Sequence, residues 1–399
     1  MALTLCARSA AIAPSATLAI TARANQLRAE GFPVIGFGVG EPDFDTPKSI
    51  CDAAREALDM GLTRYTAAAG DIALRRAICR KLQRDNGLAF DPSEIVVSNG
   101  AKHALYNVCA ALINPGDEVL LPAPYWVSYA EMIRLRGGIP VIIHGRPEND
   151  FIVTADMMRE YITPRTKALI LNSPNNPNGC VWNREQLQAI ADLAVEKEFY
   201  VISDEIYEKL VYDGAEHVSI ASLGDEIKRQ TVVINGVSKS YAMTGWRIGY
   251  AAGARHVMQV VASFQSHTAS APNTMAQHAA VAALDGGEES ICAMREEFDA
   301  RRRLMVEMIR SIPGVSCRMP KGAFYVMMDI RALFGKGTGG GIINSTSAFA
   351  QMLLSSKYVA VVPGDAFGDG YHVRLSYATS RENIAEGLRR IGEFVAELQ

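Results

Sequence analysis

The sequence contains no long hydrophobic run and no block of charge of one sign. No stretch of its 399 residues approaches the roughly 20 consecutive apolar residues that a membrane-spanning helix needs. Lysine and arginine total 40, and aspartate and glutamate total 43, which leaves a net charge of -3 and no charged tail. These absences argue against a membrane protein and against a nucleic-acid-binding protein. We therefore expect small molecules as partners.

Cysteine is also scarce. The seven cysteines are scattered, form no Cys-x-x-Cys pair and are odd in number, which argues against a zinc site and against a disulfide framework. We expect no bound metal and a reducing, cytoplasmic location. The first twenty residues are rich in alanine, but Arg8 and Pro14 interrupt the apolar run and no charged segment precedes it. A secretory signal is therefore not expected.

The length of the chain is sufficient for two packed domains. In the middle of the sequence, short apolar runs alternate with longer helical patterns, which is typical of a mostly parallel sheet covered by helices. Helices are expected at 101–113, 126–136 and 184–197, among others. The expected strands span 95–98, 118–121, 140–144, 168–172, 200–203, 231–235 and 248–251. The central part is therefore predicted to be α/β.

The C-terminal part has a different pattern. The charged, amphipathic stretch 289–311 predicts one long helix, and shorter strands are expected at 323–328, 359–362 and 371–376. These elements indicate a second, smaller domain. The glycine-rich segment 334–345 is predicted to be a surface loop. It contains a formal GxGxxG at Gly335–Gly340, but no strand leads into it, so we do not expect it to bind a dinucleotide.

Polar segments follow several predicted strands, at the sheet edge where open α/β proteins bind ligands. In 96–105, Gly100 and Ala101 begin a helix whose free backbone N–H groups can hold a phosphate. In 172–179, Asn176 precedes a proline and therefore has an extended backbone that can direct its amide inward. Taken alone, each segment is better explained as an ordinary turn or loop.

Two further segments carry ionisable side chains. Asp204 and Tyr207 follow an apolar strand, where a carboxylate is costly unless it meets a positive partner or caps a helix. Lys239 and Arg247 follow another strand, within 235–250. A desolvated lysine can lose its proton and form a Schiff base, whereas an arginine stays charged and can bind a phosphate. Most lysines are solvated surface charges, so the surrounding motifs must show whether Lys239 forms a Schiff base.

Those motifs resemble the motifs of class I, fold-type I aminotransferases. They are PSAT (14–17), GEPDFDTP (40–47), SPNNPNG (173–179), SDEIY (203–207), SKSYAMTGWRIGY (238–250) and VRLSYA (373–378). The resemblance runs nearly from end to end. Within the family, PSAT, GEPDFDTP, PAPYWVSY (122–129) and AMTGWRIGYAAG (242–253) are most similar to bacterial aspartate aminotransferases of the subgroup that also contains prephenate aminotransferases.

The resemblance implies a fold-type I PLP-transferase of the α/β class. Its large cofactor-binding domain, with a mostly parallel seven-stranded sheet between helices, is expected at 46–287. A smaller α+β domain is expected from 1–45 together with 288–399. The implied reaction uses pyridoxal 5'-phosphate to transfer the amino group of L-aspartate to 2-oxoglutarate, giving oxaloacetate and L-glutamate. The implied partners are amino acid and 2-oxo acid substrates and a second copy of the chain, which shares the active sites.

By resemblance, three residues are catalytic. Lys239 holds the cofactor as a Schiff base and later moves the proton between the substrate and the cofactor. Asp204 pairs with the protonated pyridine nitrogen, and Tyr207 hydrogen-bonds the phenolic oxygen together with Asn176. Trp126 corresponds to the aromatic residue stacked on the cofactor ring, and core packing is the alternative role for it.

The resemblance also assigns the binding of the phosphate. Arg247, Ser238 and the backbone of Ala101 and Lys102 are expected to hold it. Tyr65 is expected to arrive from a second subunit, so the active site would require a dimer.

The substrate is expected to contact a partly overlapping set of residues. Arg374 corresponds to the arginine that binds the α-carboxylate, and Gly40 to the glycine that lets the substrate approach closely. Lys102 corresponds to the residue that meets the side-chain carboxylate of a dicarboxylic donor, while Trp126 and Asn176 complete the substrate-binding group.

The sequence departs from its relatives at three places. Ala13 precedes PSAT where many subgroup members have a lysine, and this leaves the use of prephenate open. His103 follows Lys102 where many have a glutamine. Gly236 stands where other aminotransferases place a phosphate-binding serine, for which Ser238 is expected to compensate.

Other classes of protein share some of these features. Lyases and synthases on the same fold use the same lysine, aspartate and arginine. A transcription regulator with an aminotransferase domain would carry a DNA-binding module before PSAT, for which the sequence leaves no room. A nicotinamide dehydrogenase would need a strand before its glycine motif. The aminotransferase is the favoured interpretation, with an aromatic or prephenate specificity as the alternative to aspartate.

Overall fold

A mostly parallel sheet forms the centre of the larger part of the molecule. The computed structural model describes residues 4–12, 16–339 and 341–399. Within these residues, seven strands form one sheet in the order β2-β8-β7-β6-β5-β3-β4. β8 runs antiparallel to β2 and β7, and the neighbouring pairs from β7 to β4 are parallel. The strands are β2 (Ile95–Asn99), β3 (Glu118–Ala123), β4 (Ile139–His144), β5 (Thr166–Asn172), β6 (Tyr200–Asp204), β7 (Thr231–Gly236) and β8 (Ile248–Ala252). All seven predicted strands and the predicted α/β class are confirmed.

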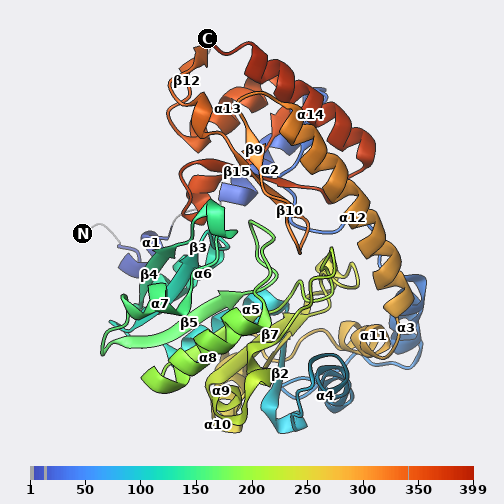
Figure 1. Ribbon diagram of the computed structural model, residues 1–399. Helices are drawn as coiled ribbons and strands as arrows, with labels where there is room; N and C mark the ends of the chain where they lie inside the picture. Colours follow the sequence, from blue (N-terminus) through green and yellow to red (C-terminus); the bar gives the residue numbers. More distant parts are fainter. Residues whose placement is uncertain (1–3, 13–15, 340) are drawn as a thin grey trace.

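Helices cover both faces of this sheet (Figure 1). They are α3 (Lys48–Asp59), α4 (Ile72–Asn86), α5 (Ala101–Leu112), α6 (Ser128–Leu135), α7 (Ala155–Arg159), α8 (Arg184–Lys197), α9 (Asp225–Gln230), α10 (Arg255–Thr268) and α11 (Thr274–Asp285). Side chains alternate along β2: Val96 packs with α5, α6 and α10, whereas Ile95 and Val97 pack with α4 and α11. Because both faces are covered, the central strands are nearly continuous apolar runs, as in β7.

A smaller antiparallel sheet lies at the other end of the molecule. Its strands are β9 (Ser316–Cys317), β10 (Tyr325–Asp329), β14 (Val362–Pro363) and β15 (His372–Ser376), in the order β14-β15-β10-β9. Around it pack α12 (Glu288–Ser311), α13 (Thr346–Lys357) and α14 (Arg381–Ala396). The long predicted helix at 289–311 is confirmed as α12. Among the described residues, no helix is long and apolar enough to cross a membrane.

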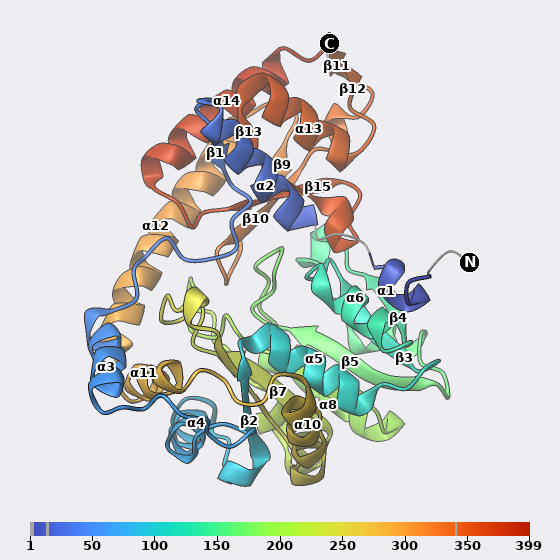
Figure 2. The ribbon, with the colours of Figure 1, turned by 180° about the vertical axis from the view of Figure 1, so that it is seen from behind.

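The N-terminal segment joins this smaller part. It contains α1 (Ala7–Ala10), α2 (Ala16–Ala29) and β1 (Ile35–Gly36), and β1 pairs in parallel with β13 (Val359–Ala360). Figure 2 shows α2 and β1, in blue, among the orange and red C-terminal elements. On these contacts we propose the division of the chain expected from the sequence, with a large domain at 46–287 and a small domain from 1–45 and 288–399.

Two local predictions are wrong. The single strand expected at 359–362 is two short strands, because β13 pairs with β1 while β14 pairs with β15 in a different sheet. The surface loop expected at 334–345 contains a small hairpin of β11 (Gly337–Thr338) and β12 (Gly341–Ile342). Gly340, within the formal GxGxxG, lies outside the described residues.

An aromatic cluster anchors α12 to the smaller sheet. Phe298 is fully buried, and its ring centroid lies 5.3 Å from that of Phe44, 5.4 Å from that of Phe324 and 6.3 Å from that of Tyr377. These partners come from the N-terminal segment, from the residue before β10 and from the residue after β15. A single ring therefore ties together segments that are far apart in the sequence.

We expect Phe298→Ala to lower the free energy of unfolding by about 3–5 kcal/mol, since deleting a buried phenyl ring leaves a cavity. Val260→Ala is the matched control, because Val260 is 51% exposed on α10, and its effect should stay within about 0.5 kcal/mol. Urea denaturation followed by circular dichroism measures both. Equal losses in the two variants would show that the aromatic cluster does not stabilise the attachment of α12.

Candidate active site

A cavity of about 550 Å³ opens at the carboxyl ends of the central strands. It receives residues from the ends of β5 and β6, from the segment after β7 and from β10 and β15 of the smaller sheet. The polar segments singled out in the sequence therefore meet at one place, as parallel strands require. The lining residues are Thr21, Gly38, Val39, Gly40, Glu41, Ala101, Lys102, Trp126, Tyr129, Asn172, Asn176, Asp204, Ile206, Tyr207, Ser238, Lys239, Thr244, Gly245, Arg247, Tyr325 and Arg374.

Asp204 is the last residue of β6, and its carboxylate is buried. One carboxylate oxygen accepts a hydrogen bond of 2.7 Å from the Tyr129 hydroxyl, and the other accepts one of 3.2 Å from the backbone N–H of Ile206. Burial raises the pKa of Asp204 to about 6, although both hydrogen bonds work in the opposite direction. The cavity thus presents a carboxylate that a positive group would stabilise.

Lys239 lies three residues after β7, with its side chain in the cavity. Its ammonium group donates a hydrogen bond to the backbone carbonyl of Gly40. The pKa of Lys239 is lowered to about 8, mainly by desolvation, with a contribution from the charges of Arg247 and Arg374 and an opposing effect of Glu41. A lysine with such a pKa is partly neutral near pH 7–8, which is the form that can attack a carbonyl or accept a proton.

Arg374 is buried in β15. Its guanidinium donates hydrogen bonds of 2.9 Å to the side-chain oxygen of Asn176 and 2.8 Å to the carbonyl of Gly38, and it lies 4.4 Å from the ring centroid of Tyr325. Among the described residues its Nε has no hydrogen-bond partner. Burial lowers its pKa, so the cation is held at a cost. A buried guanidinium with an unused donor beside a cavity is suited to an anionic ligand.

Tyr207 and Asn176 approach the cavity from neighbouring strands. The hydroxyl of Tyr207 lies 2.9 Å from that of Tyr325, and burial raises the pKa of Tyr207 well above its ordinary value. The backbone N–H of Asn176 donates to the side-chain oxygen of Asn172 over 2.9 Å, which fixes the loop after β5. Because the Asn176 side chain also accepts from Arg374, both side chains are held in place by the protein itself.

A second group of donors lies at the start of α5. Gly100 precedes this helix with φ of +87°, and among the described residues no side chain caps it. Arg247 donates to the carbonyls of Thr244 and Asn99 over 2.8 and 3.2 Å. A Cβ at Gly100 would overlap the Arg247 guanidinium, so only glycine allows this approach. With buried Ser238, these groups form an arrangement suited to a phosphate.

Arg247 itself adopts φ of +59°, a left-handed conformation that is unfavourable for residues other than glycine. Such conformations persist where the surrounding structure enforces them, often at functional sites.

Lys102 and Trp126 form the outer part of the cavity. The ammonium group of Lys102 lies 4.7 Å from the Trp126 ring centroid, a favourable cation–π distance. Desolvation lowers the pKa of Lys102, and the charge of Arg247 adds to the effect. A second cation is therefore available at a position separate from Arg374.

Some of the expected residues lie elsewhere. Tyr65 is 94% exposed and does not line the cavity. At Gly236, an added Cβ would stand 2.9 Å from the Cα of Gly249 and from the carbonyl oxygen of Ile248, so a serine there would require a shift of β8. Ala13, with the Pro14 and Ser15 of PSAT, lies outside the described residues.

Several lining residues were not expected from the sequence. Tyr129 follows Trp126 by three residues within PAPYWVSY, and helical spacing could have revealed it. Tyr325 and Gly38 carry no comparable signal, because the smaller sheet and the N-terminal segment bring them to the cavity only in the folded chain. Glu41 and Thr244, joined by a hydrogen bond of 2.6 Å, lie in motifs that we noted for other residues.

Taken together, the cavity defines a class of site. It offers a partly neutral lysine, a buried carboxylate, an aromatic side chain and donors for a phosphate. The buried carboxylate and the unused Arg374 donor both call for charged ligand groups. These residues fit an aromatic, phosphorylated aldehyde with a basic ring nitrogen, together with a carboxylate-bearing substrate.

Comparison with known proteins agrees with this class. Residues 33–391 match the model of the family "Aminotransferase class I and II". The aspartate aminotransferase of Bacillus sp. (strain YM-2) is 47% identical over 96% of this chain and 97% of its own length. An aspartate/prephenate aminotransferase of Cereibacter sphaeroides is 45% identical over 98% of both chains. The solved structure of aspartate aminotransferase from Thermus thermophilus with maleate has a TM-score of 0.93, with 43% identity, and covers 98% of this chain and 100% of that one.

The chain belongs to the class I and II aminotransferase family. It is a pyridoxal-phosphate-dependent aminotransferase of fold type I, as the motifs predicted.

The raised pKa of Asp204 predicts how the stability of the apo-protein changes with pH. Because the folded-state pKa of about 6 exceeds the ordinary value of 3.8, the ionised carboxylate destabilises the apo-protein above pH 6. This penalty disappears as the pH falls toward 4. We expect Asp204→Asn to stabilise the apo-protein at pH 8 by up to about 3 kcal/mol, and to give no gain near pH 4.

Urea denaturation of the apo-proteins at the two pH values measures this difference. The same variant should bind pyridoxal phosphate more weakly, since a neutral amide cannot balance a pyridinium. Asp59→Asn, at an exposed position at the end of α3, is the control for a change of charge. A variant that is less stable than the wild type at pH 8 would contradict the electrostatic interpretation.

Proposed function

We propose that this enzyme transfers the amino group of L-aspartate to 2-oxoglutarate, giving oxaloacetate and L-glutamate. The observation that carries the proposal is the pair of cations in one cavity, the buried Arg374 and the more exposed Lys102. A dicarboxylic substrate has two carboxylates to satisfy, and the two cations are held by different elements, β15 and α5. The names of the Bacillus and Thermus relatives support the same substrate.

Pyridoxal phosphate, when bound, withdraws electrons from the α-carbon of an amino acid. In our proposal Lys239 attaches the cofactor and, once released, carries the proton removed from the α-carbon. Its lowered pKa supports this role, because a neutral amine can accept a proton near pH 8. The Gly40 carbonyl accepts a hydrogen bond from Lys239. This contact keeps the amine in the cavity.

The other cofactor contacts follow the positions found in the cavity. We assign the ring nitrogen to Asp204, the phenolic oxygen to Tyr207 and Asn176, and one ring face to Trp126. Tyr129 supports this set, because its hydroxyl donates to the Asp204 carboxylate and thereby orients it.

We assign the phosphate to Arg247, Ser238 and the backbone N–H groups of Ala101 and Lys102. Tyr65, exposed in one chain, would reach the phosphate of a second chain, so we also propose a homodimer with shared active sites. A phenol at 94% exposure offers a large apolar surface that a partner subunit could bury.

For the substrate, we assign the α-carboxylate to Arg374, with Gly40 and Asn176 beside it. Lys102, stacked on Trp126, takes the side-chain carboxylate. The Cereibacter relative favours one second candidate, a transaminase that also accepts prephenate. A cytoplasmic location remains part of the proposal and is supported by seven cysteines that are all free.

The donor can be identified from the half-reaction alone. L-Aspartate, L-alanine and L-phenylalanine are added separately to the holoenzyme without any oxo acid, and the loss of the visible cofactor band is timed. We expect aspartate to react fastest. Lys239→Ala should be at least about a thousandfold slower with every donor. Faster reaction with phenylalanine would replace aspartate by the aromatic alternative, and a wild type without a bound-cofactor band would overturn the proposal.

The contribution of Lys102 can be measured separately. Lys102→Met removes the cation and keeps the backbone N–H, so we expect kcat/KM for aspartate to fall about 10- to 100-fold, the size of one charged hydrogen bond. The value for alanine should change less than about threefold by the same reasoning. Lys102→Arg keeps the charge and serves as the control. A parallel fall for both donors would show that Lys102 does not select the side chain.

A further inference from the structure

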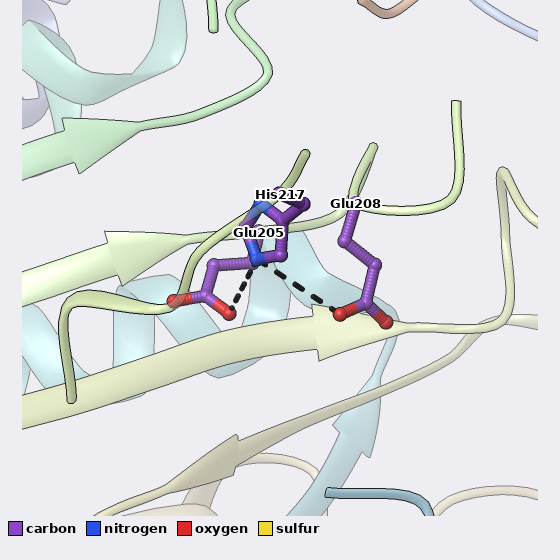
Figure 3. Close-up of side chains that lie close together, drawn as sticks. All are labelled: Glu205, Glu208 and His217. Atoms are coloured by element: carbon purple, nitrogen blue, oxygen red, sulfur yellow. Dashed lines mark hydrogen bonds and ion pairs between the residues drawn. The ribbon is translucent and has the colours of Figure 1, made fainter. Parts of the chain in front are cut away.

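Behind the cavity lies a buried polar cluster that the reaction, as described so far, does not use. Its members are Glu205, Glu208 and His217 (Figure 3). Glu205 and Glu208 belong to the same short segment as Asp204 and Tyr207, yet neither lines the cavity. The segment therefore presents one set of side chains to the cofactor and another to the interior of the protein.

Glu205 is almost completely buried, at 1% exposure, and both oxygens of its carboxylate have polar partners. One carboxylate oxygen accepts hydrogen bonds from the hydroxyls of Ser203 at 2.8 Å and Ser219 at 2.7 Å. The other lies 3.1 Å from Nε2 of His217. The backbone N–H of Glu205 also donates to the Ile234 carbonyl of β7 over 2.9 Å. Glu205 is therefore tied to β6, to β7 and to the loop at 217–219.

Glu208 connects the same segment to α4. Its carboxylate forms an ion pair with Lys81 and accepts a 2.9 Å hydrogen bond from the side chain of Asn86. Nε2 of His217 lies 4.0 Å away and bridges the two glutamates, as the dashed lines in Figure 3 show. Burial opposes ionisation of Glu208, but Lys81 holds its pKa below the ordinary value.

Two further charges border the cluster. Asp85 of α4 lies 3.9 Å from Lys81 and 3.0 Å from Lys209, the residue that follows Glu208. The network therefore contains carboxylates and ammonium groups in alternation. Its partners come from α4, from the end of β6 and from the loop before α9.

Two carboxylates and a histidine with ligand atoms within 4.8 Å of one another have the composition of a metal site. The observed contacts favour a different cation. Lys81 pairs with one oxygen of Glu208 and the Asn86 side chain donates to the other, while two hydroxyl donors occupy one oxygen of Glu205. The protein thus supplies its own positive charge to the cluster.

We propose that Glu205 and Glu208 are positioning residues that hold Asp204 and Tyr207 against the cofactor, with His217 and Lys81 as their fixed partners. The inference rests on the proposed roles of Asp204 and Tyr207. The two glutamates lie on either side of Ile206 and Tyr207, and the backbone N–H of Glu208 donates to the Glu205 carbonyl over 2.9 Å. Anchoring both ends of this turn removes its freedom to move, which keeps the cofactor-facing side chains preorganised.

Glu205 has an electrostatic effect as well. Although burial is the main cause, the negative charge of Glu205 helps to raise the pKa of Asp204. The same negative charge would also favour a protonated, positively charged ring nitrogen beside Asp204. The position of Glu205 therefore supports Asp204 both mechanically and through its charge.

Glu205→Gln tests the proposal, because it keeps the shape of the side chain and removes its charge. We expect the apo-protein to bind pyridoxal phosphate about tenfold more weakly, the size of effect seen when a residue that orients a ligand-binding group is lost. The pH midpoint of the visible band of the holoenzyme should move to lower pH by about half a unit, since a negative charge has been removed nearby. Glu216→Gln, exposed in the loop next to His217, is the matched control and should change neither quantity.

A folded Glu205→Gln protein with wild-type cofactor affinity and an unchanged pH midpoint would overturn the proposal. If that variant does not fold, Glu208→Gln is measured in the same way, because its amide oxygen can still accept from Lys81. Unchanged values in that variant would then count against the proposal. A purely structural role would lower the melting temperature without moving the pH midpoint, and this result also contradicts positioning through charge.

The donor preference of the wild type does not enter this test, so a wrong aspartate assignment is distinguishable from a wrong role for the glutamates. Dialysis of the holoenzyme against EDTA checks the identity of the cation. We expect an unchanged melting temperature if Lys81 is the cation of the cluster. A fall of several degrees would overturn that assignment.

Discussion

The burial of the Asp204 carboxylate at the end of a central strand is the constraint on which the active site depends. The strand is covered on both faces, so its last residue is almost completely removed from water, and desolvation raises the pKa of the acid to about 6. Tyr129 and the Ile206 N–H satisfy its oxygens but bring no positive charge. A basic ring nitrogen supplies what is missing, which makes the cofactor part of the energetics of the fold.

Several positively charged side chains lie close together in the cavity and determine the rest of its electrostatics. Lys239, Lys102, Arg247 and Arg374 all line it, and their mutual repulsion adds to desolvation in lowering the pKa values of both lysines. The protein tolerates this repulsion because the site is built for anions: a phosphate at one group of donors and carboxylates at the others. Glu41, hydrogen-bonded to Thr244, is an acidic exception within the lining.

In our proposal, the side chains that contact the cofactor are also anchored on the side away from the cavity. Asp204 and Tyr207 lie on a segment whose other side chains, Glu205 and Glu208, enter a buried network with Lys81 and His217. The segment leaves β6 in a tight turn, closed by the hydrogen bond from the Glu208 N–H to the Glu205 carbonyl, and in such a turn side chains three residues apart face the same side. One short stretch of chain therefore serves both the chemistry and its own anchoring.

The seven central strands, α12 and the segments that meet in the cavity could be predicted from the residues alone, because apolar periodicity and strand-end positions are local properties. Lys239, Asp204 and Arg374 could be named from their motifs alone. The folded chain was needed to show that Tyr325 and Gly38 reach the cavity, that 359–362 divides between two sheets, and that Glu208 forms an ion pair with Lys81. Those contacts join segments distant in the chain, and no local pattern of residues records which distant partner a side chain will find.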